Sequence, residues 1–277
     1  MLVKVIFSAL LLMAIGGCAI VAPSSTIQLG PLKQISLPIK EALERQTRLP
    51  AAMSANALVQ FTLKGKAQPR VTGIINWERA ENGLKLRATG LGAMGVTVFD
   101  CLLTDDWLYL YIPSHGVIYT ADLGDEALLP DGRMLNGIAD EAMLVLAPWS
   151  AYGMGGDKDV SECPAGQWEG SSVRPLCIGF VEDGRRGVVG LDPKTLAPLY
   201  LRLEGLDVRY SAPDGLPDGS PYPTGFHLEM AGLGLKIDVD LKKILPRRPD
   251  VSLFDPAPFC QGRILPLSVL IDRIKNS

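Results

Sequence analysis

The chain has 277 residues, of which 47% are hydrophobic and 21% are charged, and its formal net charge at pH 7 is −3. Its densest basic stretches are the pairs Lys242-Lys243 and Arg247-Arg248, whereas nucleic-acid binding needs larger clusters of cations that displace counterions. We therefore expect no nucleic-acid partner. The length suits one large β-rich domain or two small ones.

The N-terminus has the pattern of an export signal. Lys4 precedes an apolar stretch over residues 5–13, and small residues then lead to Cys18. This order is typical of a secretory signal peptide, and the apolar stretch is too short for a permanent membrane-spanning helix. Small residues followed by a cysteine resemble the lipobox of bacterial lipoproteins, in which that cysteine becomes the lipidated first residue. The alternative is an ordinary signal peptide that happens to contain a cysteine.

The lipobox resemblance implies a membrane anchor. Acyl chains such as palmitate on Cys18 would hold the protein firmly, because each buried methylene contributes about 0.8 kcal/mol. In that family an Asp after the cysteine retains the protein at the inner membrane, but here Ala19 follows. We therefore expect the periplasmic face of the outer membrane. The expected organisation is a signal peptide at 1–17, a lipidated tether at 18–37 and a single domain at 38–277 with an insert at about 121–175.

Four cysteines remain after Cys18. An even number in an exported protein favours disulfides. Cys163 and Cys177 are close in sequence across a loop, so we favour them as one pair, which leaves Cys101 and Cys260 as a long-range pair. The alternative is four free thiols.

Apolar and polar residues alternate with period two through much of the chain. This alternation at 59–63, 71–78, 84–87, 96–101, 107–112 and 117–120, with turn residues between, predicts an antiparallel meander. Strands resume between 174 and 241, most clearly at 235–241, which gives about eleven in all. Helical spacing predicts short helices at 38–48 and around 138–149, and Pro266 could open a final helix.

Signals for catalysis are weak. Only two histidines are present, His115 and His227, and both are better explained as structural. The common nucleophile, zinc-protease, phosphate-loop and dinucleotide motifs do not occur in the sequence. The acidic pairs at 105–106 and 122–126 fit solvated turns better than a catalytic or calcium site. We therefore expect no enzyme activity, no metal and no cofactor.

The order of several motifs resembles one family. These are the run Gly73-Ile74-Ile75-Asn76-Trp77-Glu78-Arg79, then Leu84-Lys85-Leu86-Arg87-Ala88-Thr89 and a Gly-rich loop, and later Val188-Val189-Gly190-Leu191-Asp192-Pro193-Lys194-Thr195-Leu196-Ala197-Pro198-Leu199. The alternating run 235–241, followed by Pro246 and 251–254, resembles the end of such folds. Together they resemble the outer-membrane receptor (LolB) and the periplasmic carrier (LolA) of lipoprotein sorting, over about residues 55–120 and 185–255.

The resemblance implies a fold and a function. The fold is mainly β (α+β): an incomplete antiparallel β-barrel of about eleven strands, with helices covering or plugging an apolar cavity that accepts acyl chains. Matching Trp77 to the family's tryptophan places the receptor's protruding apolar loop residue at Met94, with Leu91 as its neighbour. Inward-facing strand residues are the candidate cavity lining: Phe61, Leu63, Ile75, Trp77, Leu84, Leu86, Val98, Leu108 and Leu110.

Two functions follow as hypotheses. The first is an acyl-chain-binding lipoprotein or chaperone that transfers or localises lipoproteins or lipids at the outer membrane, with membrane lipid, acyl chains and a periplasmic carrier protein as partners. The second is a non-catalytic envelope scaffold that binds a protein partner through its sheet edges or its insert. The same alternation also fits an ordinary packed β core, and only an empty cavity would distinguish an acyl-binding interior from a packed one.

Overall fold

The computed structural model describes most of the chain beyond the tether: residues 37–47, 51–80, 83–124, 137–154, 160–163, 174–182, 185–216, 221–230 and 234–275. The predicted signal peptide, the lipidation site Cys18 and all of the tether before Leu37 lie outside the described residues.

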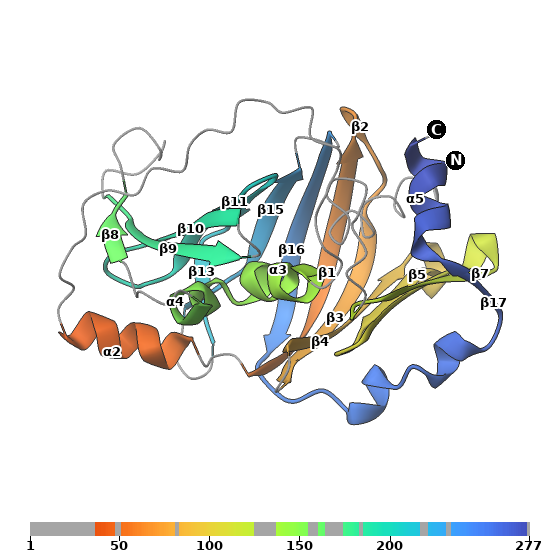
Figure 1. Cartoon of the computed structure of the whole chain (residues 1–277), viewed down its shortest axis with the longest axis horizontal. Coiled ribbons are helices and arrows are strands. Elements are labelled where there is room, and N and C mark those ends of the chain that lie inside the picture. The colour runs from red at the N-terminus through yellow and green to blue at the C-terminus, as the bar shows by residue number, and fades with distance from the viewer. Residues whose placement is uncertain are drawn as a thin grey trace.

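One large curved sheet dominates the fold (Figure 1). Its strands follow the order β17-β7-β6-β5-β4-β3-β1-β16-β15-β12-β11-β10-β9-β8, and β2 pairs with β1 as a fifteenth strand. Strands β13 (Pro213–Gly215) and β14 (Pro221–Pro223) form a separate pair. The main-sheet strands are β1 (Ala52–Leu63), β2 (Lys66–Ala67), β3 (Val71–Ala80), β4 (Gly83–Leu91), β5 (Thr97–Leu103), β6 (Trp107–Ile112), β7 (Val117–Asp122), β8 (Val160–Glu162), β9 (Leu176–Glu182), β10 (Arg185–Leu191), β11 (Pro198–Leu203), β12 (Leu206–Tyr210), β15 (Gly225–Met230), β16 (Leu235–Leu245) and β17 (Arg263–Pro266).

The sheet curves around a small group of helices (Figure 1). Helix α3 (Gly137–Leu146), the 3-10 turn η3 (Pro148–Ser150) and helix α4 (Ala151–Met154) lie in the hollow, and α2 (Leu37–Gln46) packs beside η3 and α4. Leu43 of α2 is fully buried. The two helices expected at 38–48 and around 138–149 are therefore present. The predicted insert supplies α3, η3, α4 and the edge strand β8.

Alternation along the strands separates an inner face from an outer face. In β16 the side chains of Leu235, Ile237, Val239 and Leu241 are buried, whereas Lys236, Asp238 and Asp240 between them are exposed. Successive side chains of a strand point to opposite faces, so the apolar set points towards the helices. The main core fills the space between this inner face and the helices.

The C-terminal segment wraps around the β7 edge of the sheet. After β16, the turns η5 (Val251–Phe254) and η6 (Ala257–Cys260) pack on the outer face over β4 and β6. There Phe254 and Phe259 form a second core with Leu102 and Ile118. Strand β17 then pairs with β7, and α5 (Leu267–Lys275) packs against β7 and β17 and buries two leucines in the main core.

The predicted topology needs two corrections. The main sheet has more strands than the eleven expected, because β2, β8 and β17 have only two to four residues and show too little alternation to predict. The pairing of β17 with β7 is parallel, not antiparallel, because the chain passes over the outer face before it returns. Within the described residues the end strands β17 and β8 do not pair, so the sheet is an incomplete barrel, as expected. None of the described helices is long and apolar enough to cross a membrane.

Candidate functional site

All nine candidate lining residues lie on the inner face. Each belongs to the main core or packs against it, and they divide by exposure. Five are buried: Phe61, Trp77, Leu84, Leu108 and Leu110. Four are half-buried: Leu63, Ile75, Leu86 and Val98.

The half-buried residues lie on one half of the sheet, on β1, β3, β4 and β5. Ile75 lies opposite Ala88 on β4 and opposite Ala55 on β1. Ala88 is also half-buried, and Gly73 on β3 adds no side chain to this area. Small residues and incompletely covered apolar residues therefore meet at the centre of this half, which we call the open half (inner face of β1, β3, β4 and β5).

The other half of the inner face is covered. Its apolar side chains on β9 to β12 and β15 are buried, namely Leu176, Ile178, Phe180, Val189, Leu191, Leu201, Leu203, Leu206, Val208, Phe226, Leu228 and Met230. Helix α4 packs on β9, and η3 packs on β11. Helix α3 packs on β4 of the open half, where Phe61, Trp77 and Leu84 are buried. The two halves therefore differ in that only the open half also has the half-buried apolar residues Leu63, Ile75, Leu86 and Val98.

Polar contacts tie α3 to residues of β10, β12 and β14. The Arg185 guanidinium on β10 bonds to Glu141 of α3 at 2.6 Å, and Glu141 is almost fully buried. The Tyr222 hydroxyl donates to the Leu146 carbonyl at 2.7 Å, and the Tyr210 hydroxyl donates to the Val145 carbonyl at 3.1 Å. Burial raises the pKa of both tyrosines, so both stay protonated as donors. The last carbonyls of α3 thus gain partners that a helix end lacks.

Met94 is the most exposed of the large apolar side chains in the described residues, at 98%. It lies between β4 and β5 in the 3-10 turn Ala93–Gly95, and the next residue, Val96, is 61% exposed. Met94 has φ +59°, in the left-handed region that non-glycine residues seldom adopt. The Gly92 amide donates to the Val96 carbonyl at 2.8 Å and closes the loop, while Leu91 stays half-buried. A strained backbone therefore holds an apolar side chain in solvent.

The exposed loop adjoins the open half. Val98, two residues after Val96, is a half-buried inner-face residue, and one of its methyl carbons would lie 3.0 Å from a side chain at Gly92. Apolar surface thus continues from the inner face to the loop. We call this edge of the sheet, which carries the ends of β1, β4 and β6 and the starts of β3, β5 and β7, the Met94 end.

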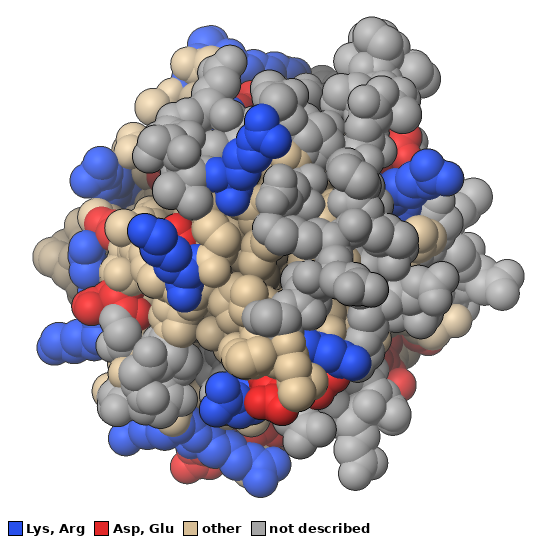
Figure 2. Space-filling view, turned by 90° about the vertical axis from the view of Figure 1, so that its left-hand side faces the viewer, with Lys and Arg blue, Asp and Glu red and all other residues tan. Residues whose placement is uncertain are grey.

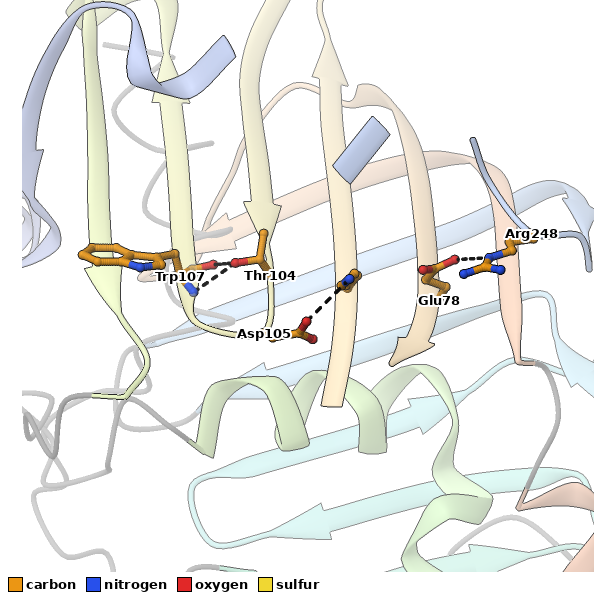
Figure 3. A network of polar contacts seen from close by, with 6 residues as sticks. Glu78, Thr104, Asp105, Trp107 and Arg248 are labelled. Atoms are coloured by element: carbon orange, nitrogen blue, oxygen red, sulfur yellow. Dashed lines mark hydrogen bonds and ion pairs between the residues drawn. The ribbon is translucent and has the colours of Figure 1, made fainter. Parts of the chain in front are cut away.

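The opposite edge, the Trp107 end, carries paired polar groups (Figure 3). Arg248 bonds to Glu78 at 2.9 Å, and Lys85 approaches Asp105 at 3.5 Å. The Trp107 amide donates a hydrogen bond to the Thr104 hydroxyl at 3.0 Å. Asp105 is thus an ion-pair partner in a turn, as its sequence context suggested.

The described residues contain no group of three or more side chains suited to hold a metal ion. His115 lies 3.2 Å from the Tyr119 hydroxyl, and His227 lies 2.7 Å from Asp238 on the outer face. Both histidines therefore make local contacts. Figure 2 views the molecule from the α2 and β8 side, where Lys and Arg are spread around the face with Asp and Glu between them.

The cysteines confirm one predicted pair and correct the other. Cys163 and Cys177 form a disulfide beside β8 and β9, and the Tyr200 hydroxyl lies 3.1 Å from each sulfur. The predicted Cys101–Cys260 pair is wrong, because both thiols are free. Cys101 is buried on the inner face, whereas Cys260 is exposed in η6 on the outer face. The sheet separates them.

Sequence reasoning missed three parts of this site. Ala88 continues the inward alternation of Leu84 and Leu86, so its inner-face position was predictable from the sequence. It was not included among the candidate lining residues because its side chain is small. Val96 was expected inside a strand, yet β5 begins at Thr97. Leu265 of β17 packs against the inner core, and nothing in its sequence context indicates the parallel pairing that brings it there.

Solved structures share this architecture. A DUF1329 family protein from Desulfovibrio piger aligns with a TM-score of 0.54 and 14% identity, over 81% of this chain and 100% of that chain. A domain assigned to outer-membrane lipoprotein sorting from Vibrio parahaemolyticus aligns with a TM-score of 0.55 and 10% identity, over 80% and 97%. The chain shares the fold of these two proteins. The resemblance found in the sequence is thus confirmed at the level of the fold.

A LolA superfamily protein from Nitrosomonas europaea aligns less closely, with a TM-score of 0.48 and 12% identity over 78% of this chain and 96% of that chain. Scans of the sequence against protein-family models and against curated proteins found no match.

Proposed function

We propose that this protein is an outer-membrane-anchored lipoprotein that holds acyl chains on the open half of its sheet and passes lipoproteins or lipids to the membrane. The observation that carries the proposal is the contrast between the two halves of the inner face. Leu63, Ile75 and Val98 are incompletely covered, whereas the apolar inner-face side chains of β9 to β12 and β15 are buried, with α4 packed on β9 and η3 on β11.

Binding would be non-covalent. An acyl chain that leaves water for apolar surface gains about 0.8 kcal/mol for each buried methylene, so a long chain needs no charged partner. Ala55, Gly73 and Ala88, which pair across the middle of the open half or lie next to it, have small side chains or none. No catalytic group is needed for this role, and no cofactor is proposed.

Transfer would use the loop between β4 and β5. Met94 and Val96 expose apolar side chains that water does not favour, and Val98 links them to the inner face. An exposed apolar group is favourable where it meets an apolar partner. We infer that this partner is the membrane, which a lipid on Cys18 would keep within reach, and that cargo arrives from a periplasmic carrier.

The first test asks what the protein carries. The full chain with Cys18→Ala, which lacks the acyl anchor, is purified and extracted for mass spectrometry of lipids. Bound fatty acid, phospholipid or lipopeptide supports the proposal. Lipid-free protein that co-purifies with a stable protein partner contradicts it and supports the envelope-scaffold alternative.

The second test locates the binding surface. Ala88→Phe in the same background fills the open half and should weaken binding of a fluorescent fatty acid about tenfold, equivalent to roughly two lost methylene contacts. Thr72→Phe is the matched control, because it adds the same side chain at an exposed position of β3 on the outer face. Equal affinities for the two variants would place the acyl chain elsewhere.

A further inference from the structure

Four cations at the Met94 end have no anionic partner among the described residues. Lys64, Lys66, Arg70 and Arg263 are all exposed, and none forms an ion pair with the described part of the chain. Arg70 donates a hydrogen bond to the neutral Gln60 side chain at 3.2 Å, so its charge stays uncompensated. These four residues are called the basic rim.

Carboxylates are missing from the same region. Segments 60–72, 88–99, 110–118 and 262–266 make up the Met94 end from β1 to β17, and their sequences contain no Asp or Glu. On the neighbouring β15, Glu229 is at the same end but pairs with Lys236 at 3.0 Å. The whole chain has a net charge of −3, so a region with only positive charge departs from the average of the protein.

The Trp107 end differs because it carries carboxylates that pair with nearby cations. There Arg248 pairs with Glu78 and Lys85 pairs with Asp105 (Figure 3). Lys85 and Arg248 at that end are therefore neutralised within the protein, whereas the cations of the basic rim are left for an external anion.

Strand register places the basic rim on both sides of Met94. Thr72 pairs with Leu91, so Arg70 lies beside the start of the exposed loop on the neighbouring strand. Lys64 lies in the β1–β2 turn, and Lys66 begins β2. Strand β1 continues for four residues past Val59, the residue that pairs with Val71 of β3, so its end projects roughly 13 Å beyond β3 at 3.3 Å per residue. Arg263 pairs with Val117 on the other side, beyond β6.

We propose that the Met94 end is a membrane-binding surface that selects bilayers rich in anionic lipid. An exposed apolar point between uncompensated cations is the arrangement that binds at a bilayer interface, where apolar side chains enter the acyl boundary and cations contact lipid phosphates. A protein partner would need a cavity for Met94 ringed by acidic groups, whereas an anionic bilayer supplies both features everywhere on its surface. The proposal deepens the proposed function by naming the lipid class at the transfer step.

The experiment measures vesicle binding without the covalent anchor. The full chain with Cys18→Ala is titrated with vesicles of neutral phosphatidylcholine and with vesicles in which about one lipid in three is anionic phosphatidylglycerol. We expect tighter binding to the anionic vesicles and weaker binding as salt rises, because salt screens exposed charges.

The decisive variant is the triple change Lys66→Gln, Arg70→Gln and Arg263→Gln. At about 1 kcal/mol per cation, it should weaken binding to anionic vesicles on the order of 100-fold and leave binding to neutral vesicles unchanged. The matched control is Lys194→Gln, Arg209→Gln and Arg247→Gln, three exposed cations outside the Met94 end, which changes net charge equally. Equal binding by the two triple variants would overturn the proposal, as would equal binding of the parent to both kinds of vesicle.

Two further measurements distinguish this proposal from the proposed acyl-binding function and from binding of a protein partner. Fluorescent fatty-acid binding by the basic-rim variant should equal that of the parent. If the parent binds no fatty acid but still binds anionic vesicles more tightly than neutral ones, the proposed function is refuted and the membrane-binding proposal stands. If the basic-rim variant loses capture of an acidic periplasmic protein but keeps full vesicle binding, the surface serves a protein and the membrane proposal is wrong.

Discussion

The ring of Phe99 on β5 occupies the space above Gly90 on β4. The two residues pair across the strands, and a Cβ at Gly90 would lie 2.1 Å from Phe99 Cε1, closer than two carbon atoms can approach. Phe99 is buried on the inner face beside the half-buried Ala88 and Val98. The absence of a side chain at Gly90 thus lets the Phe99 ring pack directly on the backbone of β4.

Gly90→Ala is therefore expected to be destabilising, by about 1–3 kcal/mol, because the ring must leave its rotamer or the strand must shift. Urea denaturation measures the free energy of unfolding. Gly153→Ala is the matched control: Gly153 is in helix α4, has a negative φ and has no atom within 4 Å of the added carbon. There alanine should be neutral or slightly stabilising. Equal losses at the two sites would show that Phe99 does not depend on Gly90.

The two free thiols should differ in reactivity. In the Cys18→Ala chain at pH 8, a thiol reagent should label Cys260 rapidly, because it is exposed, and Cys101 only on unfolding. Burial raises the pKa of Cys101 to about 12, and the charge of Asp100 adds to the shift, so the reactive thiolate is scarce in the folded protein. Cys260→Ser should remove the fast phase. A fast phase that persists in this variant would contradict the placement of Cys101.

The same shift predicts the response to alkali. Unfolding lets Cys101 ionise near its ordinary pKa of about 8.5, so the folded state binds more protons than the unfolded state between about pH 9 and 12. The contribution of this thiol is thus fully present below pH 8 and is lost as pH rises through that window. Burial also raises the pKa of Tyr210 and Tyr222, so Cys101→Ala should reduce the alkaline slope of stability without abolishing it. An unchanged slope would contradict the burial of Cys101.

The sequence predicts strands well where one face of the sheet is buried and the other is solvated. In β16 apolar and charged residues alternate without interruption from Leu235 to Lys242, and the structure has a strand there. The alternation also placed Phe61, Ile75 and Val98 on one face. It did not distinguish half-buried from buried residues, since that difference arises from where α3, η3 and α4 pack, which depends on contacts far apart in sequence.

The wrap of the C-terminal segment was not predictable in the same way. Strand β17 has four residues, mostly exposed, and its position depends on Phe254 and Phe259 fitting against Leu102 and Ile118 on the outer face. The Cys101–Cys260 prediction failed for the same reason, because only the three-dimensional path shows that this segment crosses to the other side of the sheet. The basic rim was equally hidden, since Arg263 comes from a segment far along the chain from Lys64, Lys66 and Arg70, and no short sequence window contains all four.

The buried ion pair between Glu141 and Arg185 is expected to tie α3 to β10. Removing one partner, as in Arg185→Met, should cost about 3–5 kcal/mol of unfolding free energy, because the buried Glu141 carboxylate loses its ion pair with Arg185. Replacing both, with Glu141→Leu and Arg185→Met, should cost less than either single change. Urea denaturation of the four chains completes a double-mutant cycle, and simple additivity of the two losses would show that the groups do not interact.

Met94 allows stability and membrane transfer to be changed in opposite directions. Its left-handed backbone costs a non-glycine residue about 1 kcal/mol, so Met94→Gly should raise the free energy of unfolding by up to that amount and also remove the apolar side chain from the loop. We expect fatty-acid binding to remain and delivery of bound lipid to vesicles to slow. Met94→Leu, which keeps an apolar side chain at the same strained position, should restore delivery and leave stability unchanged. Normal delivery by the glycine variant would show that the strain at this position serves something other than transfer.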